Sequence, residues 1–243
     1  VALIRKIENC SCRDAARLLK RLCDGMEPLS PPIPPSALDS RFRPFTFRIS
    51  LNPVASFLQK NKSISIETAV RFESGVAEHS AFLKRTIALR LHDIRGNPLG
   101  YCGRRLDPVE IEKWGKWRFP TCLPKSAMLF NAHRAAGFRH QGIIVVECPW
   151  GVMRLWQAGF PNAVALLGTS LSSAQRQWLE KAPVILLMLD GDAAGRKAAV
   201  QIAASFAGKT QVVIHHLPDG FDPDDLSDDR LRSVVDRYRL FSL

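Results

Sequence analysis

The chain has 243 residues, of which 46% are hydrophobic, and it carries a formal net charge of +11 at pH 7. This length and composition are sufficient for a folded protein of one or two domains with a buried core. The longest apolar run, residues 184–189, is far shorter than the roughly 18 residues of a membrane-spanning helix, so we expect a soluble, cytoplasmic protein with no membrane partner.

The positive charge is concentrated in the first part of the chain. Residues 1–142 contain 24 Lys and Arg against 12 Asp and Glu, whereas residues 143–243 contain 10 against 11. This distribution suits a polyanion bound along the first part and an acidic, metal-binding centre in the second. A merely soluble basic surface would have the same composition. The six cysteines include no Cys-x-x-Cys pair, so they indicate reduced thiols and predict neither a disulfide framework nor a complete zinc site.

The first elements in chain order are helical. Residues 1–24 have apolar positions at helical spacing and predict an amphipathic element. The Pro-rich stretch 27–44 cannot form a helix or a central strand, so we expect a domain boundary there. Residues 52–72 predict two short helices, the second N-capped by Ser65.

Residues 86–106 predict a β-hairpin that turns at the sequence I-R-G-N-P. Its second strand ends in Arg104 and Arg105, and we expect a basic and aromatic loop after it. The cations of this loop are Lys113, Lys116, Arg118 and Lys125, and its aromatic residues are Trp114, Trp117 and Phe119. Such a mixture suits a single nucleic-acid strand, because cations contact phosphates and rings stack on bases. The aromatic residues fit equally well in the core of a small subdomain.

From residue 142 onward, predicted strands and helices alternate. The strands end at Glu147, cover 163–167, end at Asp190 and cover 211–217, and the helices cover 152–158, 172–181 and 193–206. This alternation predicts an α/β fold with a parallel sheet and right-handed crossovers. The sequence lacks a dinucleotide-binding G-x-G-x-x-G after the first strand and lacks a P-loop, so both of those nucleotide-binding folds are disfavoured.

Acidic residues follow three of the four predicted strands. Glu147 ends the first, Asp190 and Asp192 follow the third in the sequence L-D-G-D, and Asp222 and Asp224 lie in the loop after the fourth. Ligands of open α/β sheets bind at this carboxyl edge, and carboxylate oxygens suit Mg²⁺ or Mn²⁺. The D-G-D sequence alone could equally be a solvated turn, but three acidic strand ends are hard to attribute to turns.

Several segments together resemble a known family. The sequences L-D-G-D-A-A-G-R-K-A-A and L-P-D-G-F-D-P-D-D-L, with the strand that ends at Glu147, resemble the TOPRIM (topoisomerase-primase) domain of bacterial DnaG-type DNA primases. Upstream, S-I-E-T-A-V-R-F-E-S-G and D-I-R-G-N-P-L-G-Y-C-G-R-R-L resemble the segments around the family's basic subdomain, and I-E-N-C-S-C-R-D-A-A-R-L-L resembles the tail of its CHC-type zinc ribbon.

The resemblance implies a TOPRIM-type parallel sheet flanked by helices and preceded by a smaller basic α+β subdomain. We therefore expect five regions: a zinc-ribbon tail (1–27), a Pro-rich linker (28–50), a basic subdomain (51–141), a TOPRIM domain (142–229) and a C-terminal helix (230–243). It also implies that Glu147 acts as general base or metal ligand, that Asp190 and Asp192 bind the metal, and that Asp222 and Asp224 complete the cluster. The implied nucleic-acid and nucleotide contacts are Arg104, Arg105, Lys116, Arg118 and Lys125.

The sequence departs from the family pattern in one important place. The family has Glu-Gly-x-x-Asp after the first strand, whereas this chain has Cys148 for the Gly and Gly151 for the Asp, which puts the number of bound metal ions in question. The zinc ligands and the helicase-binding C-terminal domain of the family are not in this sequence. We therefore expect Zn²⁺ only in a domain missing from the chain, and a relative from a mobile element or accessory replication system.

The function that the resemblance implies is synthesis of short RNA primers on single-stranded DNA from nucleoside triphosphates, with a replicative helicase as a candidate partner. Two alternatives remain: a TOPRIM nuclease and a degenerate, non-catalytic nucleic-acid-binding module. A topoisomerase needs a nucleophilic tyrosine in a separate domain, which neither Tyr101 nor Tyr238 offers.

Overall fold

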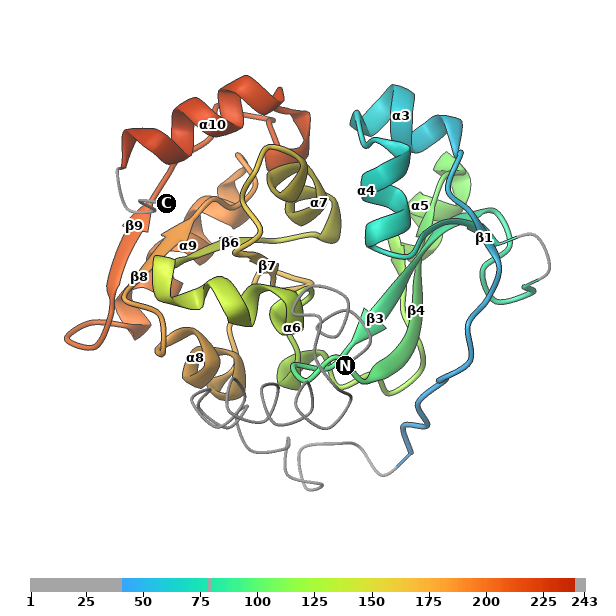
Figure 1. Ribbon diagram of the computed structural model, residues 1–243, viewed down its shortest axis with the longest axis horizontal. Helices are drawn as coiled ribbons and strands as arrows, with labels where there is room; N and C mark the ends of the chain where they lie inside the picture. Colours follow the sequence, from blue (N-terminus) through green and yellow to red (C-terminus); the bar gives the residue numbers. More distant parts are fainter. Residues whose placement is uncertain (1–40, 78–79, 239–243) are drawn as a thin grey trace, which may run out of the picture. The chain divides into compact units, whose positions relative to one another are not determined.

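The computed structural model describes residues 41–77 and 80–238, all within one compact unit, Ser36–Leu243. The predicted zinc-ribbon tail, much of the predicted linker and the last residues of the predicted C-terminal helix lie outside the described residues. Two sheets dominate the described part (Figure 1). No helix in it combines the length and the apolar character that crossing a bilayer requires.

The first sheet is antiparallel and has five strands in the order β1-β2-β3-β4-β5. Its strands are β1 (Leu51–Asn52), β2 (Ser74–Ala77), β3 (Thr86–His92), β4 (Pro98–Arg105) and β5 (Trp117–Arg118). Strands β3 and β4 form the predicted hairpin, whose turn is closed by hydrogen bonds between Asp93 and Asn97. Strand β2 was not predicted; it pairs with β1 and β3 and so becomes part of the sheet through tertiary contacts.

Helices α3 (Ser56–Lys62), α4 (Ile66–Arg71) and α5 (Pro108–Trp114) accompany this sheet. The Ser65 hydroxyl accepts a hydrogen bond from the Thr68 N–H, which confirms Ser65 as the N-cap of α4. The prediction of a continuous loop after the hairpin was wrong, because α5 and β5 lie within it. Asp107 caps α5 by accepting from the Val109 N–H at 2.8 Å, and Pro108 fills the first helical position. Helix α5 buries none of its residues.

The second sheet is parallel and has the order β7-β6-β8-β9. Its strands are β6 (Ile143–Val146), β7 (Ala163–Ala165), β8 (Val184–Leu187) and β9 (Gln211–Ile214). The helices that follow them are α7 (Pro149–Gln157), α8 (Ser173–Leu179), α9 (Ala193–Ser205) and α10 (Asp228–Arg237). The predicted α/β alternation is therefore confirmed, with α7 beginning three residues earlier than predicted because Pro149 occupies its first turn.

Helices cover both faces of the parallel sheet. Ile144 and Val146 of β6 face a core that includes residues of α7 and α10, whereas Ile143 and Val145 face a second core that includes residues of α8 and α9. This two-sided burial explains why the strands have continuous apolar sequences without alternation. The two short helices α6 (Ala132–Ala135) and η3 (Ala136–Gln141) lead into β6.

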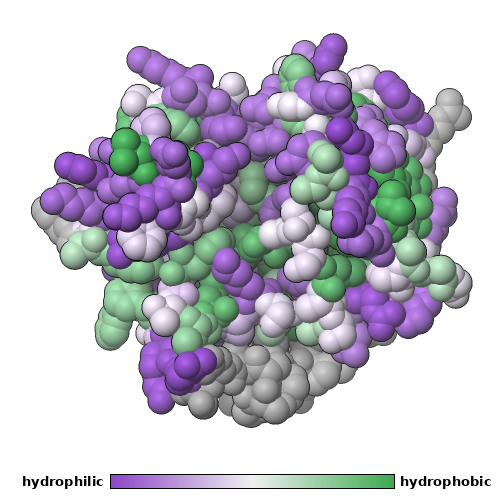
Figure 2. Space-filling view, turned by 180° about the vertical axis from the view of Figure 1, so that it is seen from behind, coloured by the Kyte–Doolittle hydropathy of each residue, from purple (hydrophilic) through white to green (hydrophobic). Residues whose placement is uncertain are grey.

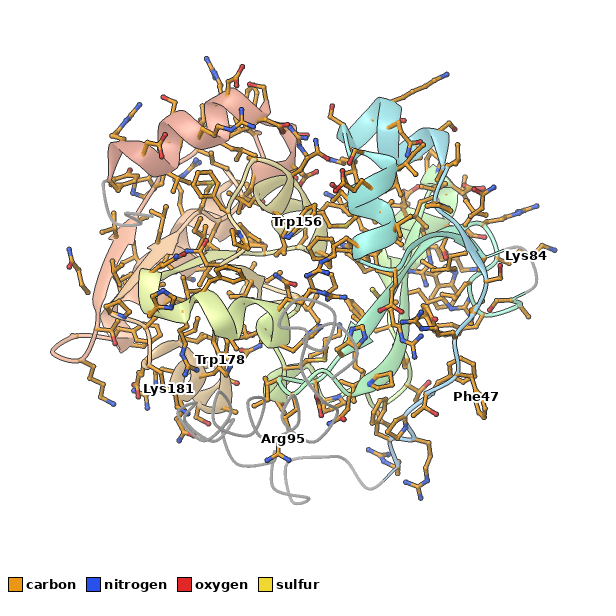
Figure 3. The ribbon with its side chains drawn as sticks, in the orientation of Figure 1. Phe47, Lys84, Arg95, Trp156, Trp178 and Lys181 are labelled. Atoms are coloured by element: carbon orange, nitrogen blue, oxygen red, sulfur yellow. The ribbon has the colours of Figure 1, made fainter. Side chains whose placement is uncertain are left out.

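The two sheets share the first of these cores. Helix α4 packs against α7 (Figure 1), and Phe72 stacks on Phe130 and meets the Trp156 ring edge to face at 5.9 Å. Figure 3 shows Trp156 between the parts of the chain that carry the two sheets, whereas Phe47, which is 75% exposed, points away from the core. Figure 2 shows that hydrophilic side chains cover most of one face, with smaller apolar patches between them.

A partly buried cluster of charged and imidazole groups lies at the same junction. Glu73 pairs with Arg90 at 3.3 Å, with His92 at 3.4 Å and with Arg134 at 3.8 Å. The rings of His92 and His133 lie 4.6 Å apart. Burial and then the charge of Arg134 lower the pKa of His92 to about 4 and that of His133 to about 3. Both imidazoles are therefore neutral in the folded chain at neutral pH.

We expect acidification to destabilise the fold through this histidine pair. A histidine whose pKa is lowered by folding contributes stability above its unfolded pKa of about 6.5, and this contribution is lost as the pH falls toward the folded pKa. The melting temperature should fall between pH 6.5 and 4, and it should fall less steeply in His133→Gln. The exposed His140→Gln is the matched control and should reproduce the wild-type slope. Parallel slopes for all three proteins would contradict this role.

Candidate active site

The acidic strand ends converge on one cavity of about 230 Å³. Glu147 comes directly after β6, and Asp190 lies three residues after the neighbouring parallel strand β8. Asp222 and Asp224 belong to η4 (Pro223–Asp225) and its N-cap, after β9. Because the carboxyl ends of parallel strands meet at one edge, the side chains of Glu147, Asp190, Asp222 and Asp224 all line this cavity.

Glu147 holds the two strand ends together. Its Oε1 accepts a hydrogen bond from the backbone N–H of Asp190 at 3.2 Å. Burial raises the pKa of Glu147, the Asp190 N–H opposes this, and the carboxylates of Asp192 and Asp222 raise the pKa further. The group therefore sits in an environment of excess negative charge, which a bound cation would relieve.

The environment of Asp190 strongly disfavours its charged form. Burial, followed by the charges of Glu147 and Asp222, raises its pKa to about 8. Its Oδ1 is buried and has no hydrogen-bond partner. A buried carboxylate oxygen without a partner is costly, so Asp190 either carries a proton at neutral pH or faces a cation.

Asp192 has a different position from Asp190. Its Oδ1 accepts from the Gly195 N–H at 2.6 Å, so the side chain caps α9. Asp192 is exposed and does not line the cavity, although its charge acts on both Glu147 and Asp190. Of the two acids in the D-G-D sequence, only Asp190 faces the cavity directly.

Asp224 is deeply buried and already has partners within the chain. Its side chain is 2% exposed and forms an ion pair with Lys62, the last residue of α3. The Cys148 thiol donates to the other carboxylate oxygen at 3.6 Å. Sequence reasoning missed Lys62, because no local pattern connects the end of α3 with a loop that follows β9.

The predicted nucleic-acid contacts divide into two groups. Arg104 and Lys116 line the same cavity as the carboxylates, and the Arg104 guanidinium lies 5.3 Å from the centre of the Trp150 ring. The Arg105 guanidinium instead donates to the carbonyl oxygens of Trp114, Gly115 and Trp117, and so closes the turn between α5 and β5.

The other two predicted basic contacts lie on aromatic rings and do not line the cavity. Arg118 lies over Phe82, at 4.3 Å from the ring centre, and Lys125 lies over Phe119 at 3.6 Å. Phe119 itself lines the cavity beside Trp117, with a stacked contact between their rings. Trp150 is 2% exposed and packs against Phe57, so its role is mainly in the core.

The donor chemistry of the cavity fits a hard divalent cation. Carboxylate oxygens dominate its acidic side, and the buried Asp190 Oδ1 lacks a partner. Among the described residues, no three His, Cys, Asp or Glu side chains lie close enough to hold one metal ion together. The five acids predicted from the sequence therefore do not form one tight ligand group in this geometry, and water or substrate oxygens would have to complete the coordination of a bound Mg²⁺.

Comparisons with known proteins agree with this geometry. The Toprim-like family model matches residues 144–227, which span the parallel sheet and the acidic loop after it. The DNA primase of Aquifex aeolicus is 32% identical over 148 residues, which cover 59% of this chain and 30% of that protein. Residues 144–227 of this chain are a TOPRIM domain similar to that of bacterial DnaG-type primases.

Solved structures extend the likeness of this chain to DnaG-type primases beyond the TOPRIM segment. A DNA primase domain from Pseudomonas aeruginosa matches 73% of the chain and 69% of its own length, at 26% identity and a TM-score of 0.60. A DnaG primase catalytic domain bound to single-stranded DNA has the same fold over 76% of this chain and 73% of its own, with a TM-score of 0.61 at 24% identity. The chain spans less than a third of the length of the A. aeolicus primase.

Proposed function

We propose that this chain is the catalytic part of a primase-like nucleotidyltransferase that makes short RNA primers on single-stranded DNA. The observation that carries the proposal is the convergence of Glu147, Asp190 and Asp222 from three separate strand ends on one cavity that Arg104 and Lys116 also line. Phosphoryl transfer needs this combination, because negative charge must be neutralised and the reacting groups must be held in line.

We assign a divalent cation, Mg²⁺ or Mn²⁺, to the acidic side of the cavity, with Glu147 and Asp190 as its direct ligands and Asp192 and Asp222 contributing charge. When bound, it would polarise a phosphoryl oxygen and favour deprotonation of the attacking 3′-hydroxyl. The raised pKa of Asp190 supports this assignment. Ionisation of this carboxyl group is unfavourable without a bound cation, and a nearby cation would make it favourable.

The basic wall binds and orients the polyanions. Lys116 lies close enough to Glu147 and Asp222 to affect the pKa of both, so its charge acts directly on the reaction centre. Arg104, held by its bonds to the Arg105 and Lys116 carbonyl oxygens, presents a fixed guanidinium to phosphate. Trp117 and Phe119, which are partly buried, offer ring faces for a template or nucleotide base.

Neither tyrosine of the chain is placed for a topoisomerase reaction. The Tyr101 hydroxyl is buried and accepts from the Ile49 N–H and from Arg90. The Tyr238 hydroxyl shares a hydrogen bond with the His215 ring at 2.9 Å. Neither side chain lines the acidic cavity. A covalent tyrosyl intermediate therefore finds no support in this geometry.

The test is a primer-synthesis assay on single-stranded DNA with labelled ribonucleotides and Mg²⁺ or Mn²⁺. We expect labelled RNA of a few nucleotides, with template binding that weakens as salt concentration rises. Shortened DNA without new RNA would identify a TOPRIM nuclease. Salt-sensitive DNA binding with no product and no calorimetric binding of Mg²⁺ or Mn²⁺ would identify a non-catalytic module, for which the Gly151 substitution is the main argument.

A further inference from the structure

The Asp222–Asp224 side of the cavity differs from the Glu147–Asp190 side in one respect. On the Glu147–Asp190 side, the buried Asp190 Oδ1 has no partner. On the other side, the buried Asp224 Oδ2 also lacks a hydrogen-bond partner, but it faces the Lys62 ammonium in an ion pair, and Asp224 Oδ1 accepts from the Cys148 thiol. Lys62 also reaches Asp225, with its Nζ 3.4 Å from Oδ1. The charge that a metal ion would balance on this side is thus partly balanced already.

The fold holds Lys62 in this position firmly. The next residue, Ser63, has a positive φ of 50° and ends α3. Its carbonyl oxygen accepts from Arg154 at 2.8 Å and from Gln157 at 3.0 Å, both on α7. The Lys62 side chain is 17% exposed, and its ammonium lies 5.5 Å from the centre of the Trp150 ring. Burial opposes the charged form, but Asp224 and Asp225 outweigh it and raise the pKa of Lys62.

The position of Gly151 removes a further ligand from this side. Gly151 stands where the family has an acid, so no carboxylate comes from the first turn of α7. A Cβ at this position would lie 3.3 Å from the Pro223 Cβ and 3.3 Å from the Val146 Cγ2. Such contacts are tighter than ordinary packing, so Pro223 of η4 occupies part of the space that a longer side chain at position 151 would need.

We propose that Lys62 is an internal counter-charge that takes the place of a second divalent cation beside Asp224, so that the site binds one metal ion, at Glu147 and Asp190. This inference rests on the proposed function. A fixed ammonium differs from an ion in exchange with solvent, because it neutralises the carboxylates at every metal concentration. It also leaves a cation on the protein beside Arg104 and Lys116, facing the phosphates of an incoming nucleotide.

The number of bound Mn²⁺ ions tests this inference directly. Electron paramagnetic resonance on the full chain, titrated with Mn²⁺, should show one ion per wild-type chain and one ion per Lys62→Arg chain, which keeps the charge. Lys62→Met keeps the apolar stem and removes the ammonium, so the freed carboxylates of Asp224 and Asp225 should bind a second ion, with water completing its coordination. We expect its affinity to be at least tenfold higher than that of any second ion in the wild type.

Two ions in the wild type, or a single ion in a folded Lys62→Met chain, would overturn the inference. If Lys62→Met does not fold, as judged by circular dichroism, Lys62→Gln replaces it, and the wild-type count still decides. RNA synthesis by a wild-type chain with two bound ions would refute only the role of Lys62. A wild-type chain that binds no ion and makes no RNA would refute the proposed function, and the role of Lys62 with it.

Discussion

Replacing Asp190 by Asn should abolish primer synthesis and at the same time raise the stability of the metal-free chain. The loss follows because Asn is neutral and cannot balance a divalent cation, and several kcal/mol of transition-state stabilisation correspond to a loss of about 10³-fold or more. The gain in stability follows from the burial of Asp190 among Glu147 and Asp222, which raises its pKa to about 8 and leaves Oδ1 without a partner.

The stability difference between Asp190→Asn and the wild type should depend on pH. Folding raises the pKa of Asp190 to about 8. Between about pH 4 and pH 8 the unfolded chain therefore loses this proton more readily than the folded chain does, and the wild type becomes less stable as the pH rises through this range. Asn does not titrate. The free energy of unfolding of Asp190→Asn should therefore exceed that of the wild type by about 1–3 kcal/mol at pH 8, and the two should converge below pH 4. Thermal denaturation in EDTA across this pH range measures the difference.

Asp192→Asn is the matched control, because Asp192 lies two residues after Asp190 in the same turn. Asn caps helices about as well as Asp, and Asp192 is exposed, so we expect no gain in stability at pH 8. Its loss of activity should be smaller than that of Asp190→Asn, because Asp192 acts on the site through its charge and does not line the cavity. Equal loss in both variants, or a less stable Asp190→Asn chain at pH 8, would contradict the assignment of Asp190.

Replacing Gly195 by Ala should disrupt the site by steric overlap alone. A Cβ at this position would lie 2.1 Å from the Asp190 carbonyl oxygen and 2.8 Å from the Glu147 Oε1. Backbone oxygen cannot rotate away, so the start of α9 must separate from the turn that carries Asp190. We expect a loss of several kcal/mol in the free energy of unfolding and loss of primer synthesis even in the fraction that folds.

Gly137→Ala provides the comparison, because a Cβ there has nothing within 4 Å and the φ of Gly137 lies outside the left-handed region. It should change the free energy of unfolding by less than about 1 kcal/mol, since an unstrained Ala mainly reduces the freedom of the unfolded chain. Urea denaturation of both variants tests the pair. If Gly195→Ala were as stable and as active as Gly137→Ala, the turn would tolerate a side chain at position 195. The close approach of Gly195 to the Asp190 carbonyl oxygen would then not be required.

The sequence by itself determined the elements whose signals are local. Apolar runs bounded by glycine, proline and acids predicted the four parallel strands, and the capping serine at position 65 predicted where α4 begins. The order of strands and helices then required a parallel sheet, which brings Glu147 and Asp190 to one edge whatever the details of packing.

Only the tertiary structure decided which side chains face the cavity and what neutralises them. Asp190 and Asp192 are equivalent in the sequence, but the hydrogen bond from the Gly195 N–H directs Asp192 to the helix end and leaves Asp190 in the cavity. The pairing of Lys62 with Asp224 depends on how α3 docks on α7. The physical reason is range: capping and periodicity involve residues a few positions apart, whereas the direction of a buried charge is set by packing between segments that meet only in the folded chain.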